Sequence, residues 1–193
     1  MAPKGIQTLL NKPIIPYVTD WSLPDPEPLA HADVLFVSGG ELAELPAVFE
    51  KLDAGPTRDI PVMLHIDLIN GLMNDDAGLR YVANFNRVVG VITTKHHLVH
   101  TIRKLGLYSV IRLFLQDGRA VERGMSVIER SKPDAVELLP GIAATLISAE
   151  LKQVRVPLIA GGLIRNEETA DCILKAGCQA VSTSNKHLWK LNI

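Results

Sequence analysis

Charged residues recur near the carboxyl ends of successive apolar segments of this chain. Four such segments, residues 62–67, 90–95, 110–114 and 135–140, carry Asp67, Lys95, Arg112 and Glu137 in that order. Two further apolar segments, residues 158–162 and 180–184, end in glycine and hydroxyl side chains instead. In a parallel barrel the functional groups gather at the carboxyl ends of the strands, and the last two loops commonly hold phosphate. This distribution therefore predicts a barrel with one functional face.

An alternation of β-rich and helix-rich segments runs along the chain, which is typical of repeated βα units. We predict eight strands, near residues 13–18, 34–37, 62–67, 90–93, 109–114, 135–139, 157–160 and 180–183. Helices are expected near residues 41–52, 76–86, 96–105, 119–131, 142–152, 167–176 and 186–191. We interpret residues 1–193 as a single α/β domain, a compact TIM-like (β/α)8 barrel of parallel strands. A doubly wound open sheet is the competing fold, but no Gly-x-Gly-x-x-Gly motif opens a first helix.

A proline cluster interrupts this pattern between the first two strands. Pro24, Pro26 and Pro28 lie close together, and a proline inside a helix removes a backbone donor and clashes with the preceding turn. We therefore expect a loop or one short turn over Pro24–Pro28, so that the first helix of the barrel is shortened.

The composition argues against several classes of protein. The formal net charge is −1 and 5% of the residues are aromatic, which disfavours a large nonspecific nucleic-acid surface built on charge or base stacking. No apolar stretch of about 18 residues is present, and the first residues lack the apolar core of a signal peptide. Cys172 and Cys178 form no disulfide framework and are expected to be packing thiols. These features favour a cytoplasmic protein without a membrane segment.

The four charged residues need partners at the ends of buried strands, because desolvating an unpaired charge is costly. Their formal charges cancel. One interpretation is a self-neutralising network across the barrel mouth that binds nothing. The other, which we prefer because the charges occur on successive strands, is a polar ligand pocket.

Small and hydroxyl residues at the last two strands form a second group. Gly161 and Gly162 allow a backbone to approach an anion closely. Ser182, Ser184 and Asn185 add hydroxyls and an amide, and Ser184 or Asn185 can cap the last helix. A tight turn followed by an ordinary helix cap is the alternative. Because these segments are the last two strands of the barrel, we predict a phosphate site here.

Three histidines, His96, His97 and His100, follow Lys95. Two of them, His96 and His100, have the four-residue spacing that places two metal ligands on one helix face. No acidic third ligand accompanies them at a diagnostic spacing, so we interpret them as the solvated start of a helix and expect no metal and no cofactor.

Six short motifs follow one another between about residues 60 and 190. They are His65-Ile-Asp-Leu-Ile-Asn-Gly-Leu-Met-Asn-Asp-Asp76, Ile92-Thr-Thr-Lys95, Arg112-Leu-Phe-Leu115, Glu137-Leu-Leu-Pro-Gly141, Ile159-Ala-Gly-Gly-Leu-Ile-Arg165 and Val181-Ser-Thr-Ser-Asn-Lys-His-Leu-Trp189. In content and order this series resembles the glycerol-3-phosphate-responsive antiterminator family, the glycerol uptake operon antiterminator regulatory proteins.

The resemblance implies a TIM-barrel-like bacterial regulator, not an enzyme, with glycerol 3-phosphate as its effector. It also implies binding to the leader mRNA of glycerol-utilisation genes, where it allows transcription past a terminator. Asp67 and Glu137 would then accept hydrogen bonds from the glycerol hydroxyls. Lys95 and Arg112 would either neutralise the phosphate or hold these two carboxylates. Candidate RNA contacts are basic residues on or near outer helices: Arg119, Arg123, Arg130, Lys132, Lys186 and Lys190. A homodimer that pairs two basic patches would enlarge the RNA surface of a chain with so little net charge.

Two other functions stay open at this point. The first is an enzyme acting on a small phosphorylated substrate, with Asp67 or Glu137 as general base and Lys95 as electrophile or Schiff-base amine. The second is a family member that binds the ligand but has lost RNA binding. The fold does not decide among them, because barrels host both enzymes and binding proteins.

Overall fold

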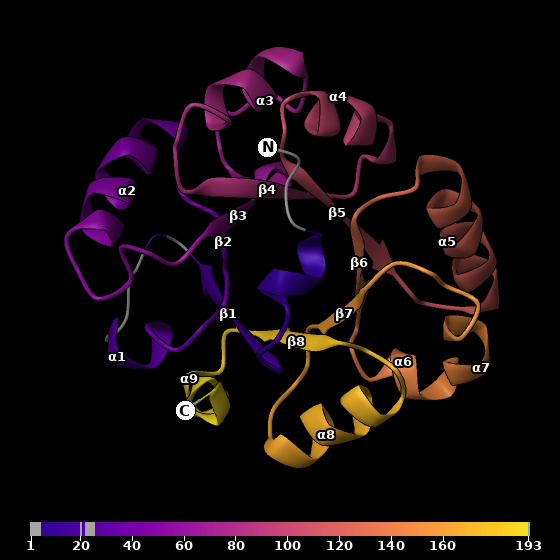
Figure 1. The fold of residues 1–193 in the computed structure, drawn as a ribbon. Coiled ribbons are helices and arrows are strands. Elements are labelled where there is room, and N and C mark those ends of the chain that lie inside the picture. The colour runs from indigo at the N-terminus through magenta and orange to yellow at the C-terminus, as the bar shows by residue number, and fades with distance from the viewer. Residues whose placement is uncertain (1–4, 20, 22–25, 193) are drawn as a thin grey trace.

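Eight parallel strands close into a barrel in chain order, from β1 to β8 and back to β1 (Figure 1). The computed structural model describes residues 5–19, 21 and 26–192. The strands are β1 (Ile14–Thr19), β2 (Leu35–Ser38), β3 (Val62–His65), β4 (Val88–Thr93), β5 (Tyr108–Phe114), β6 (Ala135–Leu139), β7 (Leu158–Gly161) and β8 (Ala180–Thr183). The predicted TIM-like barrel is therefore confirmed.

Helices connect the strands on the outside of the barrel (Figure 1). The α-helices are α1 (Pro26–Leu29), α2 (Leu45–Asp53), α3 (Asp76–Val82), α4 (Val99–Lys104), α5 (Gly118–Ser131), α6 (Ala143–Leu146), α7 (Ser148–Leu151), α8 (Glu167–Lys175) and α9 (Lys186–Trp189). Short 3-10 turns are η1 (Ile6–Leu9), η2 (Leu42–Glu44), η3 (Ile66–Leu68), η4 (His96–Leu98) and η5 (Lys190–Asn192). Within the described residues, none of these helices is long and apolar enough to cross a membrane.

The region between β1 and β2 agrees with the expectation where it is described. Pro26–Leu29 form the single turn α1, so the first helix is shortened, and Pro24 lies outside the described residues.

Two other predictions were wrong. The third strand ends at His65, which places Asp67 on the 3-10 turn η3. The helix predicted over residues 142–152 is two single turns, because the chain leaves helical geometry at Ile147, with φ of −120°.

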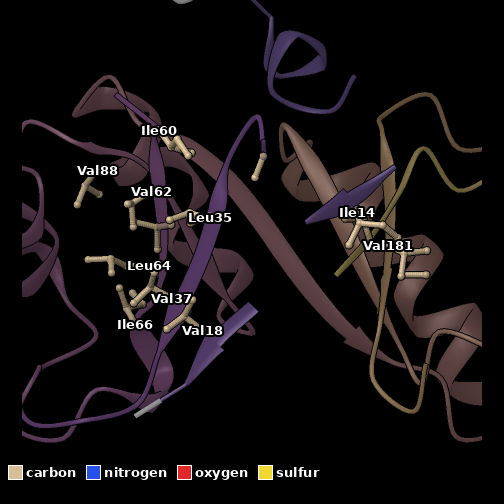
Figure 2. Close-up of a cluster of buried hydrophobic side chains, with 14 of the residues drawn as sticks. Ile14, Val18, Leu35, Val37, Ile60, Val62, Leu64, Ile66, Val88 and Val181 are labelled. Atoms are coloured by element: carbon tan, nitrogen blue, oxygen red, sulfur yellow. The ribbon is translucent and has the colours of Figure 1, made fainter. Parts of the chain in front are cut away.

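The core has two layers, which follow from the alternation of side chains along each strand. An inner cluster fills the barrel, and Ile6 of the turn η1 and Leu10 directly after it belong to this cluster. In Figure 1, η1 lies over the centre of the barrel. An outer cluster packs between the strands and the helices, and Figure 2 shows its members from β2 and β3, among them Leu35 and Leu64. Burying both faces explains why the strands are almost continuously apolar.

Polar side chains replace apolar ones at the inward positions nearest the carboxyl ends of the strands. The inward residue Ile15 is followed two positions later by Tyr17, and Met63 in the same way by His65. On seven strands these positions carry six polar side chains and one glycine: Tyr17, Ser38, His65, Arg112, Glu137, Gly161 and Ser182. We call these seven residues the polar layer. The period of two along a strand thus stacks a polar layer on an apolar one inside the barrel.

Candidate functional site

A pocket of about 520 Å³ opens above the polar layer, at the carboxyl ends of the strands. Its floor includes Tyr17, Ser38, Arg112, Glu137 and Ser182 from that layer. Its walls are the ends of β1, β6 and β8, the turn η3 after β3, and the two loops that follow β7 and β8: Thr19, Leu68, Leu139, Gly162, Leu163, Ile164, Arg165, Thr183, Ser184 and Asn185. The volume suits a small ligand, and the location is the functional end of a parallel barrel.

A buried ion pair forms the centre of the floor. Arg112 Nε donates to Glu137 Oε2 at 2.7 Å, and the two residues face each other across the β5–β6 ladder. The other carboxylate oxygen of Glu137 accepts a hydrogen bond from the Ser182 hydroxyl. Burial disfavours the charge of Arg112, but the interactions with Glu137 and with Tyr17 together outweigh that cost and raise the pKa of Arg112. Gly161 leaves room for this arrangement, since a Cβ there would lie 2.5 Å from Ser182 Oγ and 2.8 Å from Glu137 Oε1.

His65 extends the network towards β1. Arg112 Nη1 and the Tyr17 hydroxyl both lie 3.0 Å from His65 Nδ1. A guanidinium only donates hydrogen bonds, so Nδ1 is an acceptor and the neutral imidazole carries its proton on Nε2. Burial, assisted by the positive charge of Arg112, lowers the pKa of His65 to about 4. Nε2 is buried without a hydrogen-bond partner among the described residues, and Asp67 Oδ2 lies 4.0 Å from it.

The pKa of His65 makes the stability of the barrel depend on pH. Its folded value of about 4 lies below the ordinary value of 6.5, so the unfolded chain binds the extra proton between these values. We expect the free energy of unfolding to be highest above pH 6.5 and to fall by about 3 kcal/mol down to pH 4. His65→Gln keeps an acceptor for Arg112 but does not titrate. The free energy of unfolding of this variant should therefore fall less between pH 6.5 and pH 4. Urea unfolding at several pH values measures both losses, and equal losses would exclude His65 as the cause.

Asp67 and Lys95 lie at the barrel mouth but do not line the pocket. Asp67 accepts hydrogen bonds from Thr93 Oγ1 (2.6 Å) and from the amide and hydroxyl of Thr94 (both 2.7 Å). Burial alone would raise the pKa of Asp67, but these hydrogen bonds bring it below its usual value. Lys95 Nζ donates to the Asn74 side-chain oxygen at 2.9 Å when the Asn74 amide nitrogen faces the Ile66 carbonyl. Both residues therefore tie the loops after β3 and β4 to each other.

The loops after β7 and β8 form the part of the pocket suited to an anion. Gly162 has a φ of +75°, and a Cβ there would meet nothing closer than Leu139 at 3.6 Å, so the site is open above its backbone. Asn185 caps α9 by accepting from the His187 amide at 3.1 Å, and its Nδ2 donates to the Arg165 carbonyl at 2.9 Å. Asn185 thus joins the two loops. Of the predicted phosphate residues, Gly162, Ser182, Ser184, Asn185 and Arg112 line the pocket.

Arg165 is a pocket residue that the sequence analysis did not assign to the site. It is exposed, and no described carboxylate forms an ion pair with it. Arg112, by contrast, is already paired with Glu137. Arg165 is therefore the guanidinium in the pocket that is available to a phosphate. The signal that could have found it is its position three residues after Gly162, in the loop that follows a strand end.

The other candidates are dispersed. Arg119 and Arg123 lie exposed on α5, whereas Lys186 and Lys190 lie on α9 and η5, across the barrel (Figure 1). Among the described residues, no group of three histidine, cysteine, aspartate or glutamate side chains could hold a metal. Both cysteines are free: Cys178 packs in the core with its pKa raised by burial to about 11, whereas Cys172 is exposed, contrary to the packing role expected for it.

Solved structures with this architecture include two close relatives. A glycerol uptake operon antiterminator regulatory protein from Listeria monocytogenes is 32% identical, with a TM-score of 0.81 over 93% of this chain and 96% of that one. A glycerol uptake operon antiterminator-related protein from Thermotoga maritima is also 32% identical, with a TM-score of 0.80 over 93% and 98%. At 12% identity, deoxyribose phosphate aldolase from Aeropyrum pernix (TM-score 0.68, 97% and 93% covered) shares the fold alone.

The sequence itself matches relatives over most of its length. The uncharacterized protein YgcP of Escherichia coli K12 is 32% identical over 128 residues, which are 66% of this chain and 67% of that protein. The model of the family described as glycerol-3-phosphate responsive antiterminator matches residues 14–189, from the first strand to the last helix. The resemblance noted in the motifs is thereby confirmed: the chain belongs to the glycerol-3-phosphate responsive antiterminator family.

Proposed function

We propose that this protein binds leader mRNA of glycerol-utilisation genes in response to glycerol 3-phosphate and acts as a transcription antiterminator, not as an enzyme. The observation that carries the proposal is the pocket at the ends of β7 and β8, in a chain whose family responds to this ligand. Because leader transcripts are made in the cytoplasm, the proposal implies a cytoplasmic protein. A homodimer would present two RNA-contacting surfaces to one transcript.

The two halves of the pocket fit the two halves of glycerol 3-phosphate. The dianionic phosphate would lie at Gly162, Ser184, Asn185 and Arg165, where backbone, hydroxyl, amide and guanidinium groups converge. The glycerol hydroxyls would lie over the polar layer, where Glu137 can accept a hydrogen bond. In this proposal Asp67 and Lys95 hold the loops that shape the entrance, and their direct contact with the ligand is not required.

The lysines and carboxylates that an enzyme would need in the pocket are absent from its described lining or already hydrogen-bonded, which favours a sensor over an enzyme. A Schiff-base mechanism needs a lysine in the pocket, and no described lining residue is a lysine. A general base needs a carboxylate free to take a proton, but Glu137 already accepts from Arg112 and Ser182. The distant aldolase shares the barrel and carries no argument about chemistry.

A titration of labelled leader RNA tests the proposal. With glycerol 3-phosphate at saturation, we expect the RNA dissociation constant to fall about tenfold at 0.1 M salt, a typical size for such coupling. By reciprocity, RNA should tighten ligand binding by the same factor. Arg165→Gln should abolish the ligand effect while leaving the fold intact. If phosphorus NMR shows conversion of glycerol 3-phosphate, or if RNA binds equally with and without it, the enzyme or the lost-RNA alternative replaces this proposal.

A further inference from the structure

A second hollow, of about 670 Å³, lies on the outside of the barrel between α5 and the segment that joins α7 to β7. It is lined by Met125, Ile128, Glu129, Lys132, Gln153, Val154, Arg155 and Val156. A hollow of about 390 Å³ shares Val154, Arg155 and Val156 with it and continues to Lys152 and Gln179. We call the two together the basic groove. Its second part reaches the connections that precede β7 and β8, so the groove extends to the amino-terminal end of the barrel, opposite the ligand pocket.

The break between α6 and α7 accounts for the groove. Each of these turns has four residues, against fourteen in α5. At about 1.5 Å per residue, a four-residue turn cannot cover the flank of a helix more than three times its length. Met125 and Ile128 of α5 therefore line the hollow with one edge, while they also pack against the outer core cluster.

Unpaired cations concentrate along this groove. Lys132, Lys152 and Arg155 line it, and Arg103 reaches it by donating from Nη2 to the Lys132 carbonyl at 2.6 Å. None of these four forms an ion pair with a described carboxylate. Glu129 is the one carboxylate among the lining residues. In a chain with a formal net charge of −1, this is a local positive surface, which attracts a polyanion.

The exposed face of α5 carries a further group of arginines, which leads towards the other end of the barrel. Arg119, Arg123 and Arg130 are separated by four and seven residues, the spacing of one helix face. Arg119 and Arg130 are eleven positions apart, or about 16 Å along the helix. The helix ends at Lys132, whose φ is +49°. Glu122 and Glu129 are also exposed on α5, and Glu129 lines the groove, so the three arginines form a second positive cluster beside the groove.

We propose that the basic groove binds the phosphate backbone of single-stranded RNA, and that the arginines of α5 continue the contact. The inference rests on the proposed function and assigns its RNA surface. Lys132, Lys152 and Arg155 would neutralise successive phosphates, and the apolar walls of the groove would exclude water from the contact. The groove shares no lining residue with the ligand pocket, so any effect of RNA on glycerol 3-phosphate binding passes through the protein.

Three double charge reversals of equal size test the assignment. Lys132→Glu with Arg155→Glu changes the groove, and Arg119→Glu with Arg123→Glu changes the α5 face. Lys51→Glu with Arg58→Glu, on and after α2 across the barrel (Figure 1), is the matched control. Fluorescence anisotropy with labelled leader RNA, at saturating glycerol 3-phosphate and several salt concentrations, gives the affinity and its salt slope. Calorimetry with glycerol 3-phosphate confirms that each variant is folded.

The groove variant should bind RNA at least about tenfold more weakly than the control, and its salt slope should be shallower by about 1.4, for two lost phosphate contacts. The α5 variant should show a smaller loss in the same direction. If wild type binds RNA and the groove variant matches the control, the groove is not the RNA surface. If wild type binds no RNA with or without ligand, the proposed function itself fails.

Discussion

Gly162→Asp is expected to weaken glycerol 3-phosphate binding about a hundredfold relative to Gly162→Asn. Both side chains impose the same strain at the positive φ of 75°, and both have room, since the nearest atom to a Cβ is 3.6 Å away. The two variants differ in charge: the aspartate places a carboxylate where the phosphate should lie, in competition with Arg165. The comparison therefore isolates electrostatic repulsion from backbone strain.

Isothermal titration calorimetry at 0.1 M salt measures both dissociation constants, and urea unfolding shows whether the two proteins are equally stable. Higher salt should narrow the difference, because screening weakens repulsion near the protein surface. Affinities within about threefold of each other, in two equally stable proteins, would place the phosphate elsewhere and remove the role assigned to the β7 and β8 loops.

Arg112→Met is expected to lower the free energy of unfolding by about 3–5 kcal/mol, because it leaves a buried carboxylate without its cation. Glu137 is fully buried and, among the described residues, would keep only the Ser182 hydroxyl as a donor. Methionine is close to arginine in length, so lost packing contributes little. Glu137→Leu alone should cost a similar amount, since it leaves Arg112 buried and unpaired.

The double variant Arg112→Met with Glu137→Leu should be more stable than either single variant, although Ser182 and His65 lose partners in it. Urea unfolding of the four proteins closes a double-mutant cycle, which gives the coupling between the two side chains. If the losses in free energy of unfolding of the two single variants simply add up in the double variant, Arg112 and Glu137 are not coupled, contrary to what their 2.7 Å contact indicates.

The fold could be predicted from the sequence because its pattern is local and repeated. Apolar runs and glycine stops such as Gly106 and Gly177, both at positive φ, give the strands and helix ends within a few residues. The break at Ile147 could not be predicted, since neither glycine nor proline marks it. The hydrogen bonds of Asp67 could not be predicted either. Asp67 lies on the turn after β3, whereas its donors Thr93 and Thr94 come from β4 and the loop that follows it.

The site could be predicted in part. Arg112 and Glu137 occupy matching positions on neighbouring strands, so their proximity follows from register. Arg165 depends on the path of a loop through Gly162 and Leu163, both at positive φ, which no period in the sequence encodes. His65 could have been found by extending the alternation one step past Met63. The proximity of Lys132 to Arg155 could not be predicted, because the end of α5 and the segment before β7 are brought together only by the fold.

The stacking of a polar layer upon an apolar one separates the parts of the barrel that can change from the parts that cannot. The lower layer, closed by Ile6 and Leu10, and the outer cluster supply the buried apolar surface that holds the strands in register. The seven residues above them contribute chemistry and little of that surface. A lineage can therefore exchange the upper layer and two loops, and with them the ligand, without rebuilding the scaffold. Barrels that share 12% of their residues can keep one architecture.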